Sequence, residues 1–177
     1  MPDTVLIDGN NLLHAVRVLG PTRPPGRETL LKIIERWAIE HRSDVTLVFD
    51  GPAPHGAFGE QMRSERIEVL FSGSRTADDC IVERLGTLPN PDRVLVVSDD
   101  TAIQYEARRR RCRTASTTVF IASLFPPDSG LANYLADPTL DIESIIFSSR
   151  IPRLRVIPYG DQHTQTTLPN SAAMQHL

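Results

Sequence analysis

Lysine is almost absent from this sequence, and cysteine and histidine are sparse and scattered. Of the 19 basic residues 18 are arginine, and Lys32 is the single lysine. Since the motif G-x-x-x-x-G-K-[ST] is also missing, the chain is not a P-loop NTPase. Cys80 and Cys112 are too few for a four-ligand zinc site, and the five histidines lack ligand spacing. We therefore expect two buried thiols in a reducing compartment and no zinc centre.

Long apolar runs and a basic leader segment are missing as well. No basic region precedes the first apolar run at Val5, and no apolar stretch is long enough to cross a bilayer. These absences predict neither a signal peptide nor a membrane span. We therefore expect a cytoplasmic protein without a membrane partner.

The rest of the composition is ordinary for a globular protein of about one domain. The 177 residues are 40% hydrophobic and 23% charged, which excludes collagen, a disulfide scaffold and a fully disordered chain. With 22 acidic and 19 basic residues the net charge is −3, which by itself does not suggest a nucleic-acid partner. The positions of these charges are more informative than their sum.

Short apolar runs alternate with helical patterns along the first two thirds of the chain. Apolar residues at helical spacing predict helices over 28–40, 77–85 and 101–109, and Trp37 is expected in the core. The alternation predicts βαβ units and a layered α/β fold around a parallel sheet. Four runs rich in β-branched residues predict strands buried on both faces: Thr4–Ile7, Val45–Phe49, Ile67–Phe71 and Val94–Val97.

The character of the sequence changes at Pro126. We expect one domain over residues 1–125 and a partly structured C-terminal extension over 126–177. Within the extension, 142–147 and 153–157 resemble short strands, and the polar end from 161 onward is expected to be disordered. Proline and glycine also predict loops at 21–26 and 51–60.

Aspartates follow the predicted strands at their carboxyl ends. Asp8, Asp50 and the pair Asp99–Asp100 each end a strand, and Asp78–Asp79 opens a helix. Ligands of parallel α/β sheets bind outside these strand ends, so four segments are expected to bring acids to one edge. Each aspartate could instead cap a helix, and Thr76 with Asp79 resembles a capping box.

Gathering several carboxylates in one place has a cost that a metal ion would offset. Two carboxylates about 4 Å apart repel by about 4 kcal/mol at an effective dielectric constant near 20. A cluster therefore needs a cation or raised pKa values. Oxygen ligands without histidine or cysteine suit Mg²⁺ or Mn²⁺, and such sites commonly act on phosphates. We predict a metal-dependent phosphoryl-transfer site, in which Ser98 and Thr76 cap or orient rather than attack.

Four motifs in this order resemble NYN-type, PIN-like ribonucleases of the YacP-like branch. They span roughly residues 4–125 and are Asp8-Gly9-Asn10-Asn11, Val48-Phe49-Asp50-Gly51, Thr76-Ala77-Asp78 with Ile81, and Val97-Ser98-Asp99. The resemblance implies a PIN-like, Rossmann-like three-layer α/β/α sandwich with a mostly parallel central sheet. It also implies an endoribonuclease that uses Mg²⁺ or Mn²⁺ to hydrolyse RNA, leaving a 5′-phosphate and a 3′-hydroxyl.

The same resemblance implies roles for individual residues and for partners. Asn10 stands where the branch often has an aromatic residue. Single-stranded RNA or mRNA, cleaved in the context of translation, and the ribosome are the implied partners. The implied site consists of Asp8, Asp78 and Asp99 as metal ligands, Asn11 beside the first of them, Asp50 as a rim acid, and Asp79 and Asp100 in second rank.

Arginines are the candidate RNA contacts. Arg75 directly precedes the Thr-Ala-Asp motif, and Arg63 and Arg66 are expected to flank the same edge. The run Arg108, Arg109, Arg110 and Arg111 suits phosphates because guanidinium groups bind them bidentately. The alternative is a solvated helix end, which the helix dipole favours.

Two other functions remain open from the sequence. A non-catalytic RNA-binding or ribosome-associated module would keep the fold without cleaving RNA. An Asp-based phosphotransfer protein or phosphatase also gathers aspartates at strand ends. However, a receiver domain needs an acidic pair and a late lysine, and a haloacid-dehalogenase-like phosphatase needs D-x-D-x-T, where this chain reads Asp8-Gly9-Asn10.

Overall fold

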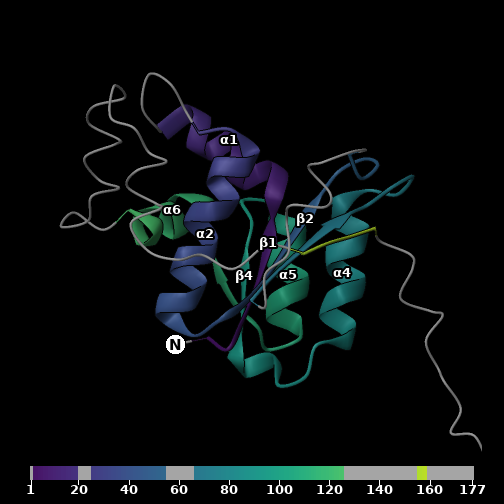
Figure 1. Cartoon of the computed structure of the whole chain (residues 1–177). Coiled ribbons are helices and arrows are strands. Elements are labelled where there is room, and N and C mark those ends of the chain that lie inside the picture. Colours follow the sequence, from purple (N-terminus) through teal and green to yellow (C-terminus); the bar gives the residue numbers. More distant parts are fainter. Residues whose placement is uncertain (1, 20–24, 55–65, 126–154, 159–177) are drawn as a thin grey trace, which may run out of the picture.

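The computed structural model describes residues 2–19, 25–54 and 66–125, together with the backbone of 155–158. Its centre is a six-stranded sheet in the order β5-β4-β1-β2-β3-β6, and every neighbouring pair is parallel (Figure 1). The strands are β1 (Thr4–Asp8), β2 (Asp44–Phe49), β3 (Ile67–Phe71), β4 (Val94–Val97), β5 (Arg113–Ala115) and β6 (Arg155–Pro158).

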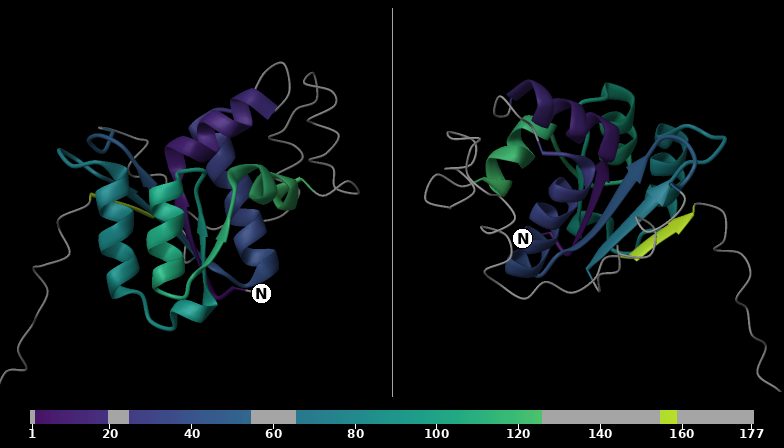
Figure 2. Two further views of the ribbon diagram at one scale, coloured as in Figure 1. Left: turned by 180° about the vertical axis from the view of Figure 1, so that it is seen from behind. Right: turned by 45° about the horizontal axis from the view of Figure 1, so that its top comes forward.

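Helices cover both faces of the sheet, so the molecule has the three layers expected of the fold (Figure 2). One face carries α1, α2 and α6, and the other carries α4 and α5. The helices are α1 (Gly9–Leu19), α2 (Arg27–His41), α4 (Ala77–Thr87), the short 3₁₀ helix η1 (Pro91–Arg93), α5 (Thr101–Arg109) and α6 (Thr117–Leu124). None of the described helices is long and apolar enough to span a membrane.

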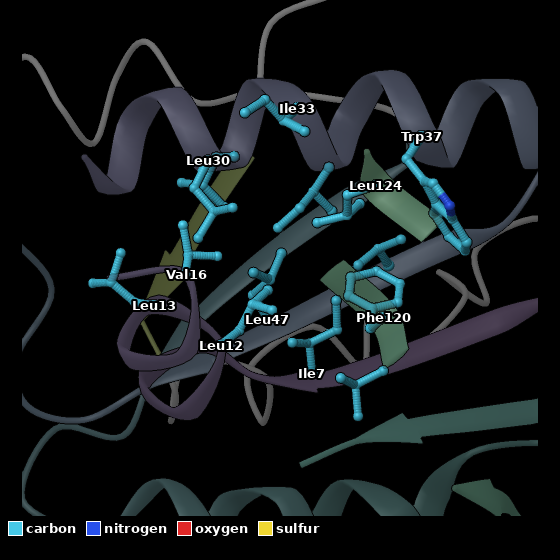
Figure 3. Close-up of a cluster of buried hydrophobic side chains, with 14 of the residues drawn as sticks. Ile7, Leu12, Leu13, Val16, Leu30, Ile33, Trp37, Leu47, Phe120 and Leu124 are labelled. Carbon is cyan, nitrogen blue, oxygen red and sulfur yellow. The ribbon is translucent and has the colours of Figure 1, made fainter. Parts of the chain in front are cut away.

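Alternate residues of the strands fill two separate hydrophobic cores. In β1, Val5 and Ile7 face α1, α2 and α6, whereas Leu6 faces α4 and α5. This is the period-two alternation of a strand, with both sides apolar because both sides are covered. Figure 3 shows the first core, in which Trp37 packs edge-on against Phe120. The expected core position of Trp37 is therefore confirmed.

The second core contains both cysteines. Cys80 and Cys112 are buried free thiols, as expected from the sequence. Burial raises the pKa of each thiol above its ordinary value, so the reactive thiolate is disfavoured.

The predicted fold class is confirmed, and the four predicted strands and three predicted helices are all present. The sequence analysis missed α1, β5 and α6. Helix α1 opens on glycine and asparagine, which have low helix propensity, and β5 is too short for a recognisable apolar run. Strand β6 overlaps the strand expected at 153–157 and adds residues beyond 125 to the sheet.

Some predictions lie outside the described residues. These are the strand at 142–147, the disordered end from 161, and most of the loops at 21–26 and 51–60. The boundary of the domain at residue 125 stays a prediction.

Candidate active site

The carboxyl edge of the sheet gathers most of the predicted acids. Asp8 is the last residue of β1 and pairs in register with Val48, two residues before Asp50. The neighbouring strand β4 ends at Val97, directly before Ser98 and the pair Asp99–Asp100. Helix α4 begins at this edge with Asp78 in its first turn. The structure therefore brings four chain segments to one edge, as predicted.

Asp8 is the most buried of these acids, with 4% of its surface exposed. Its carboxylate accepts hydrogen bonds from the Asn11 backbone N–H at 3.0 Å and from the Asn11 side-chain amide. The Ser98 hydroxyl, which is fully buried, donates to the same carboxylate at 3.3 Å. Burial raises the pKa of Asp8, although these hydrogen bonds oppose the shift. Asn11 and Ser98 thus orient the Asp8 carboxylate, and the role of Ser98 in orienting a metal ligand stays a prediction.

Asp78 is exposed at the start of α4 and lies within the electrostatic reach of the other acids. Its pKa is raised, first by desolvation and then by the negative charges of Asp8, Asp100, Asp50 and Asp79. We call Asp8, Asp50, Asp78 and Asp100 the acidic cluster. This repulsion is the unfavourable interaction that the sequence analysis expected from converging carboxylates.

Asp50, directly after β2, connects this strand to α1 and α4 through hydrogen bonds. Its Oδ1 accepts a 2.7 Å hydrogen bond from the Ala77 N–H at the start of α4, and its Oδ2 accepts one of 2.5 Å from the Asn10 amide of α1. Beside it, Thr76 caps α4 by accepting a hydrogen bond from the Asp79 N–H at 3.1 Å. Asp50 and Thr76 therefore fix the first turn of α4, and with it the position of Asp78.

The neighbours Asp99 and Asp100 point to different helices. Asp99 accepts hydrogen bonds from the backbone N–H of Thr117, at 2.9 Å, and from its hydroxyl, at the start of α6. Asp100 caps α5 by accepting from the N–H groups of Ala102 and Ile103, at 2.7 and 3.1 Å. The charge of Asp100 contributes to the raised pKa of Asp78, so Asp100, which the sequence placed in second rank, belongs to the cluster. Asp99 instead points to Thr117 and away from the cluster.

The donor set of the cluster suits a hard divalent cation, since all of its side chains offer carboxylate oxygens. As the side chains lie, however, no three histidine, cysteine, aspartate or glutamate residues within the described ranges are placed to hold one ion. Both oxygens of Asp8 and of Asp50, and the Oδ1 of Asp100, already accept hydrogen bonds from backbone, amide or hydroxyl donors. Metal ligation would therefore require side chains of the cluster to turn.

The predicted RNA-binding arginines divide between the two edges of the sheet. Arg75 lies at the carboxyl edge, where its guanidinium contacts Glu83 at 2.5 Å. Arg66 precedes β3 at the amino edge and binds Asp44 at 2.9 Å, so it does not flank the acids. Arg63 lies outside the described residues.

Arg108 to Arg111 lie at the end of α5, which runs from the carboxyl edge to the amino edge. The helix ends in a Schellman motif, with the Cys112 N–H bonded to the Ala107 carbonyl and the Arg111 N–H to that of Arg108. Arg108 and Arg109 bind Gln104 and Glu106 of the same helix. These contacts favour the helix-end interpretation, and the role in RNA binding stays a prediction for a surface far from the cluster.

Three features of this edge were not predicted from the sequence. In the sequence, Asn10 differs from the aromatic residue common at its position, and no motif includes Thr117. Arg27, at the start of α2, was also missed although it lies over the rings of Phe49 and Phe71. No local signal identifies these residues, because each acts on a residue far away in the sequence.

Comparisons with known proteins agree with this architecture. Two crystal structures of Rae1 (YacP) from Bacillus subtilis resemble the chain in fold. For one of them the TM-score is 0.59 at 21% sequence identity, and the alignment covers 77% of this chain and 82% of the Rae1 chain. For the other, a mutant, the TM-score is 0.56 at 17% sequence identity, and the alignment covers 81% of this chain and 89% of the Rae1 chain. No curated protein matches the sequence.

The family assignment rests on a sequence match over most of the chain. The model of the YacP-like NYN domain matches residues 5–128, which includes all four motifs and the whole acidic cluster. The resemblance inferred from those motifs is therefore confirmed. The chain belongs to the family of YacP-like NYN domains.

Proposed function

We propose that this chain is a metal-dependent endoribonuclease that hydrolyses RNA at the acidic cluster. The observation that carries the proposal is the convergence of Asp8, Asp78 and Asp100 from three chain segments at the carboxyl edge of the sheet. Desolvation, and then the charges of the other acids, raise the pKa of Asp78 there. Such repulsion weakens the folded protein, and a cation held between the carboxylates would relieve it. Membership of the YacP-like NYN family, whose motifs resemble those of ribonucleases, points to RNA as the substrate.

The residues that would hold the ion are Asp8, Asp78 and Asp100. When bound, Mg²⁺ or Mn²⁺ supplies Lewis acidity that activates water and neutralises charge on the scissile phosphate. Asn11 and Ser98 hold Asp8 in one orientation, so this ligand is fixed before the ion arrives. Asp50 is a less suitable ligand, because turning its carboxylate toward an ion would release two separate helices, α1 and α4, that it holds in place.

The contribution of the chain itself is therefore positioning. Asn10 and Asp50 fix the first turn of α4 and so aim Asp78, while the Ser98 hydroxyl links Asp8 to the start of the Asp100 loop. Pre-set charges of this kind stabilise a transition state without reorganising during the reaction. In hydrolysis a water oxygen forms a bond to phosphorus, the P–O3′ bond breaks and the leaving O3′ takes up a proton, so that a 5′-phosphate and a 3′-hydroxyl remain.

Cleavage of labelled single-stranded RNA by the purified chain tests the proposal. We expect cleavage with Mn²⁺ or Mg²⁺, none with EDTA, and a loss of about 100-fold or more in Asp8→Asn and Asp78→Asn. Asp92→Asn is the matched control, because Asp92 is an exposed aspartate in η1 at the opposite edge. Equal cleavage by the wild type and both cluster variants would contradict the assignment.

The same assay separates Asp99 from Asp100. Asparagine is as good a helix cap as aspartate, so Asp100→Asn keeps the start of α5 while removing one charge. If Asp100 is a ligand, this variant loses far more activity than Asp99→Asn. The opposite order would show that Asp99 leaves Thr117 when the metal binds.

A non-catalytic RNA-binding module is the second candidate. One observation favours it: among the described residues, no three side chains that could bind a metal are already arranged around one ion. This candidate predicts RNA binding that EDTA does not change, and no cleavage. The context of translation and a ribosomal partner are proposals that rest on the resemblance alone, and co-sedimentation of the chain with ribosomes tests them.

A further inference from the structure

Arg27 holds a positive charge against two aromatic rings at the carboxyl edge. Its guanidinium carbon lies 4.5 Å from the centre of the Phe49 ring and 5.7 Å from that of Phe71. The two rings stack on each other with centres 5.7 Å apart and end the neighbouring strands β2 and β3. Such cation–π contacts hold the guanidinium in place without accepting hydrogen bonds from its Nη groups, which stay able to bind another partner.

No acidic partner for this cation is found among the described residues. Its Nε atom is buried and makes no hydrogen bond within that part of the chain. Burial, and then the positive charge of Arg17, lower the pKa of Arg27, so the one side-chain charge that shifts this pKa is also positive. By contrast Arg36, on the same helix, pairs with Glu40 at 2.8 Å. Arg27 is therefore an arginine whose charge is not balanced by the contacts that the structure describes.

Arg27 stands next to the chain segments that carry the acidic cluster. Phe49 directly precedes Asp50, and its ring lies against Gly9, where an added Cβ would be 2.6 Å from the ring. Gly9 in turn directly follows Asp8. Phe49 belongs to the core beneath α1 and α2, whereas the cluster faces α4. Arg27 and the acids therefore lie on either side of the same strand ends.

We propose that Arg27 binds a backbone phosphate of the RNA, next to the phosphate that lies at the acidic cluster. A strand that crosses the carboxyl edge would place one phosphate at the acids and a neighbouring phosphate at Arg27. The guanidinium presents several N–H donors in a plane, which suits a phosphate, and the two rings hold that plane. This inference rests on the proposed function for its substrate, RNA, but not on cleavage.

RNA binding measured without metal tests the inference. The anisotropy of a labelled single-stranded oligoribonucleotide is followed in EDTA at several KCl concentrations, using the full chain. Arg27→Met removes the charge and keeps an apolar stem, Arg27→Lys keeps the charge, and Arg36→Met is the matched control from the same helix. Thermal unfolding of each variant shows that it is folded.

We expect Arg27→Met to weaken binding about tenfold, the effect of losing one charge-assisted hydrogen bond. The slope of log K against log salt should fall in magnitude by about 0.7, as for one lost contact to a single-stranded phosphate. Arg27→Lys should keep the wild-type slope, and Arg36→Met should match the wild type. Wild-type affinity and slope in Arg27→Met, or a reduced slope in folded Arg27→Lys, would overturn the inference.

The outcome is separable from that of the proposed function. Binding that depends on Arg27 without any metal-dependent cleavage would support this inference and contradict the nuclease proposal. If cleavage depends on Asp8 but RNA binding is unchanged in Arg27→Met, the nuclease proposal is supported and this inference is contradicted. A wild-type chain that does not bind RNA in EDTA but cleaves it with Mn²⁺ or Mg²⁺ would overturn this inference and leave the nuclease proposal standing.

Discussion

At the scale of single residues, Gly9 shows why the first motif needs glycine. Its backbone does not need positive φ; the requirement comes from the ring of Phe49, which leaves no space for a Cβ. Phe49 is fully buried, and it supports Arg27 on one side and precedes Asp50 on the other. One small residue therefore lets the β1 end with Asp8 and the β2 end with Asp50 approach each other.

Substitution of Gly9 by alanine should destabilise the protein. A Cβ at 2.6–2.8 Å from three atoms of the Phe49 ring forces that ring to move within a packed core. We expect a loss of about 1–3 kcal/mol in the free energy of unfolding, measured by urea denaturation. Gly86→Ala is the control of opposite sign, because an added Cβ in α4 meets only the flexible end of Arg110 at 3.3 Å. It should gain about 0.5–1 kcal/mol, and equal effects of both substitutions would contradict this explanation.

The acidic cluster should make the protein less stable as pH rises when no metal is bound. The pKa of Asp78 is raised in the folded state, so the folded chain holds this proton more tightly than the unfolded chain. The free energy of unfolding therefore falls as pH rises from the ordinary to the raised pKa, and the whole loss persists at neutral pH. Asp78→Asn should remove the loss, so in EDTA the variant should be more stable than the wild type at pH 7.

The size of that gain should depend on salt, since Asp78 is exposed and its repulsion is screened. Thermal unfolding at pH 7 in low and high KCl measures the effect, with Asp92→Asn as a control outside the cluster. A stability difference that is absent at pH 7 and present only in acid would contradict the predicted sign.

At the scale of elements, the helices end and begin through contacts that serve the fold and the site together. Asp50 and Thr76 start α4, Asp100 starts α5, and Asp99 holds the start of α6 through Thr117. The choice between helix cap and site residue, open in the sequence, is therefore not exclusive. Asp100 caps α5 and also acts on Asp78 through its charge, while Asp99 is engaged by α6.

Two helices end on an arginine in the left-handed conformation. Arg42 follows α2 with φ 54° and Arg111 follows α5 with φ 65°, and both lie at the position where glycine is favoured. Arg42→Gly and Arg111→Gly should each raise the free energy of unfolding by about 0.5–1 kcal/mol. Arg110→Gly, with φ −92°, is the control and should give no gain. Chemical denaturation measures all three, and a loss of stability in both left-handed variants would contradict the prediction.

At the scale of the whole molecule, net charge is a poor guide to the partner. The sum of −3 combines acids gathered at the carboxyl edge with arginines, of which Arg27 and Arg75 lie at the same edge. Two bound divalent ions would change the formal charge from −3 to about +1. A mildly acidic protein can therefore bind RNA once its acids hold metal.

Metal binding should stabilise the folded chain as a whole. The unfolded chain does not gather Asp8, Asp78 and Asp100, so Mg²⁺ or Mn²⁺ binds the folded state and raises the melting temperature with concentration. The rise should be absent in Asp8→Asn and unchanged in Asp92→Asn, with ionic strength held constant by KCl. An equal rise in the wild type and Asp8→Asn would show that the ions act elsewhere.

Much of this arrangement could be predicted from the sequence because it depends on local rules. Apolar runs predict strands covered on both faces, and the end of each parallel strand lies at one edge, so acids from four segments were expected to meet there, with Asp99 ranked above Asp100. The cap by Thr76 and the burial of both cysteines also follow from local chemistry. The missed α1 and β5 carry weak local signals, since glycine and asparagine open the first and the second has three residues.

Only the tertiary structure decided which side of that edge each residue faces. Successive residues at a strand end point to opposite faces, so Ser98 reaches Asp8 on the face of α4 and α5, while Asp99 reaches Thr117 on the face of α6. The partners of both lie far away in the sequence, and the same holds for Arg27 above Phe49 and Phe71. The sequence by itself determined that acids converge at one edge, because parallel strands end together; which acids face one another depends on how helices cover the two faces of the sheet.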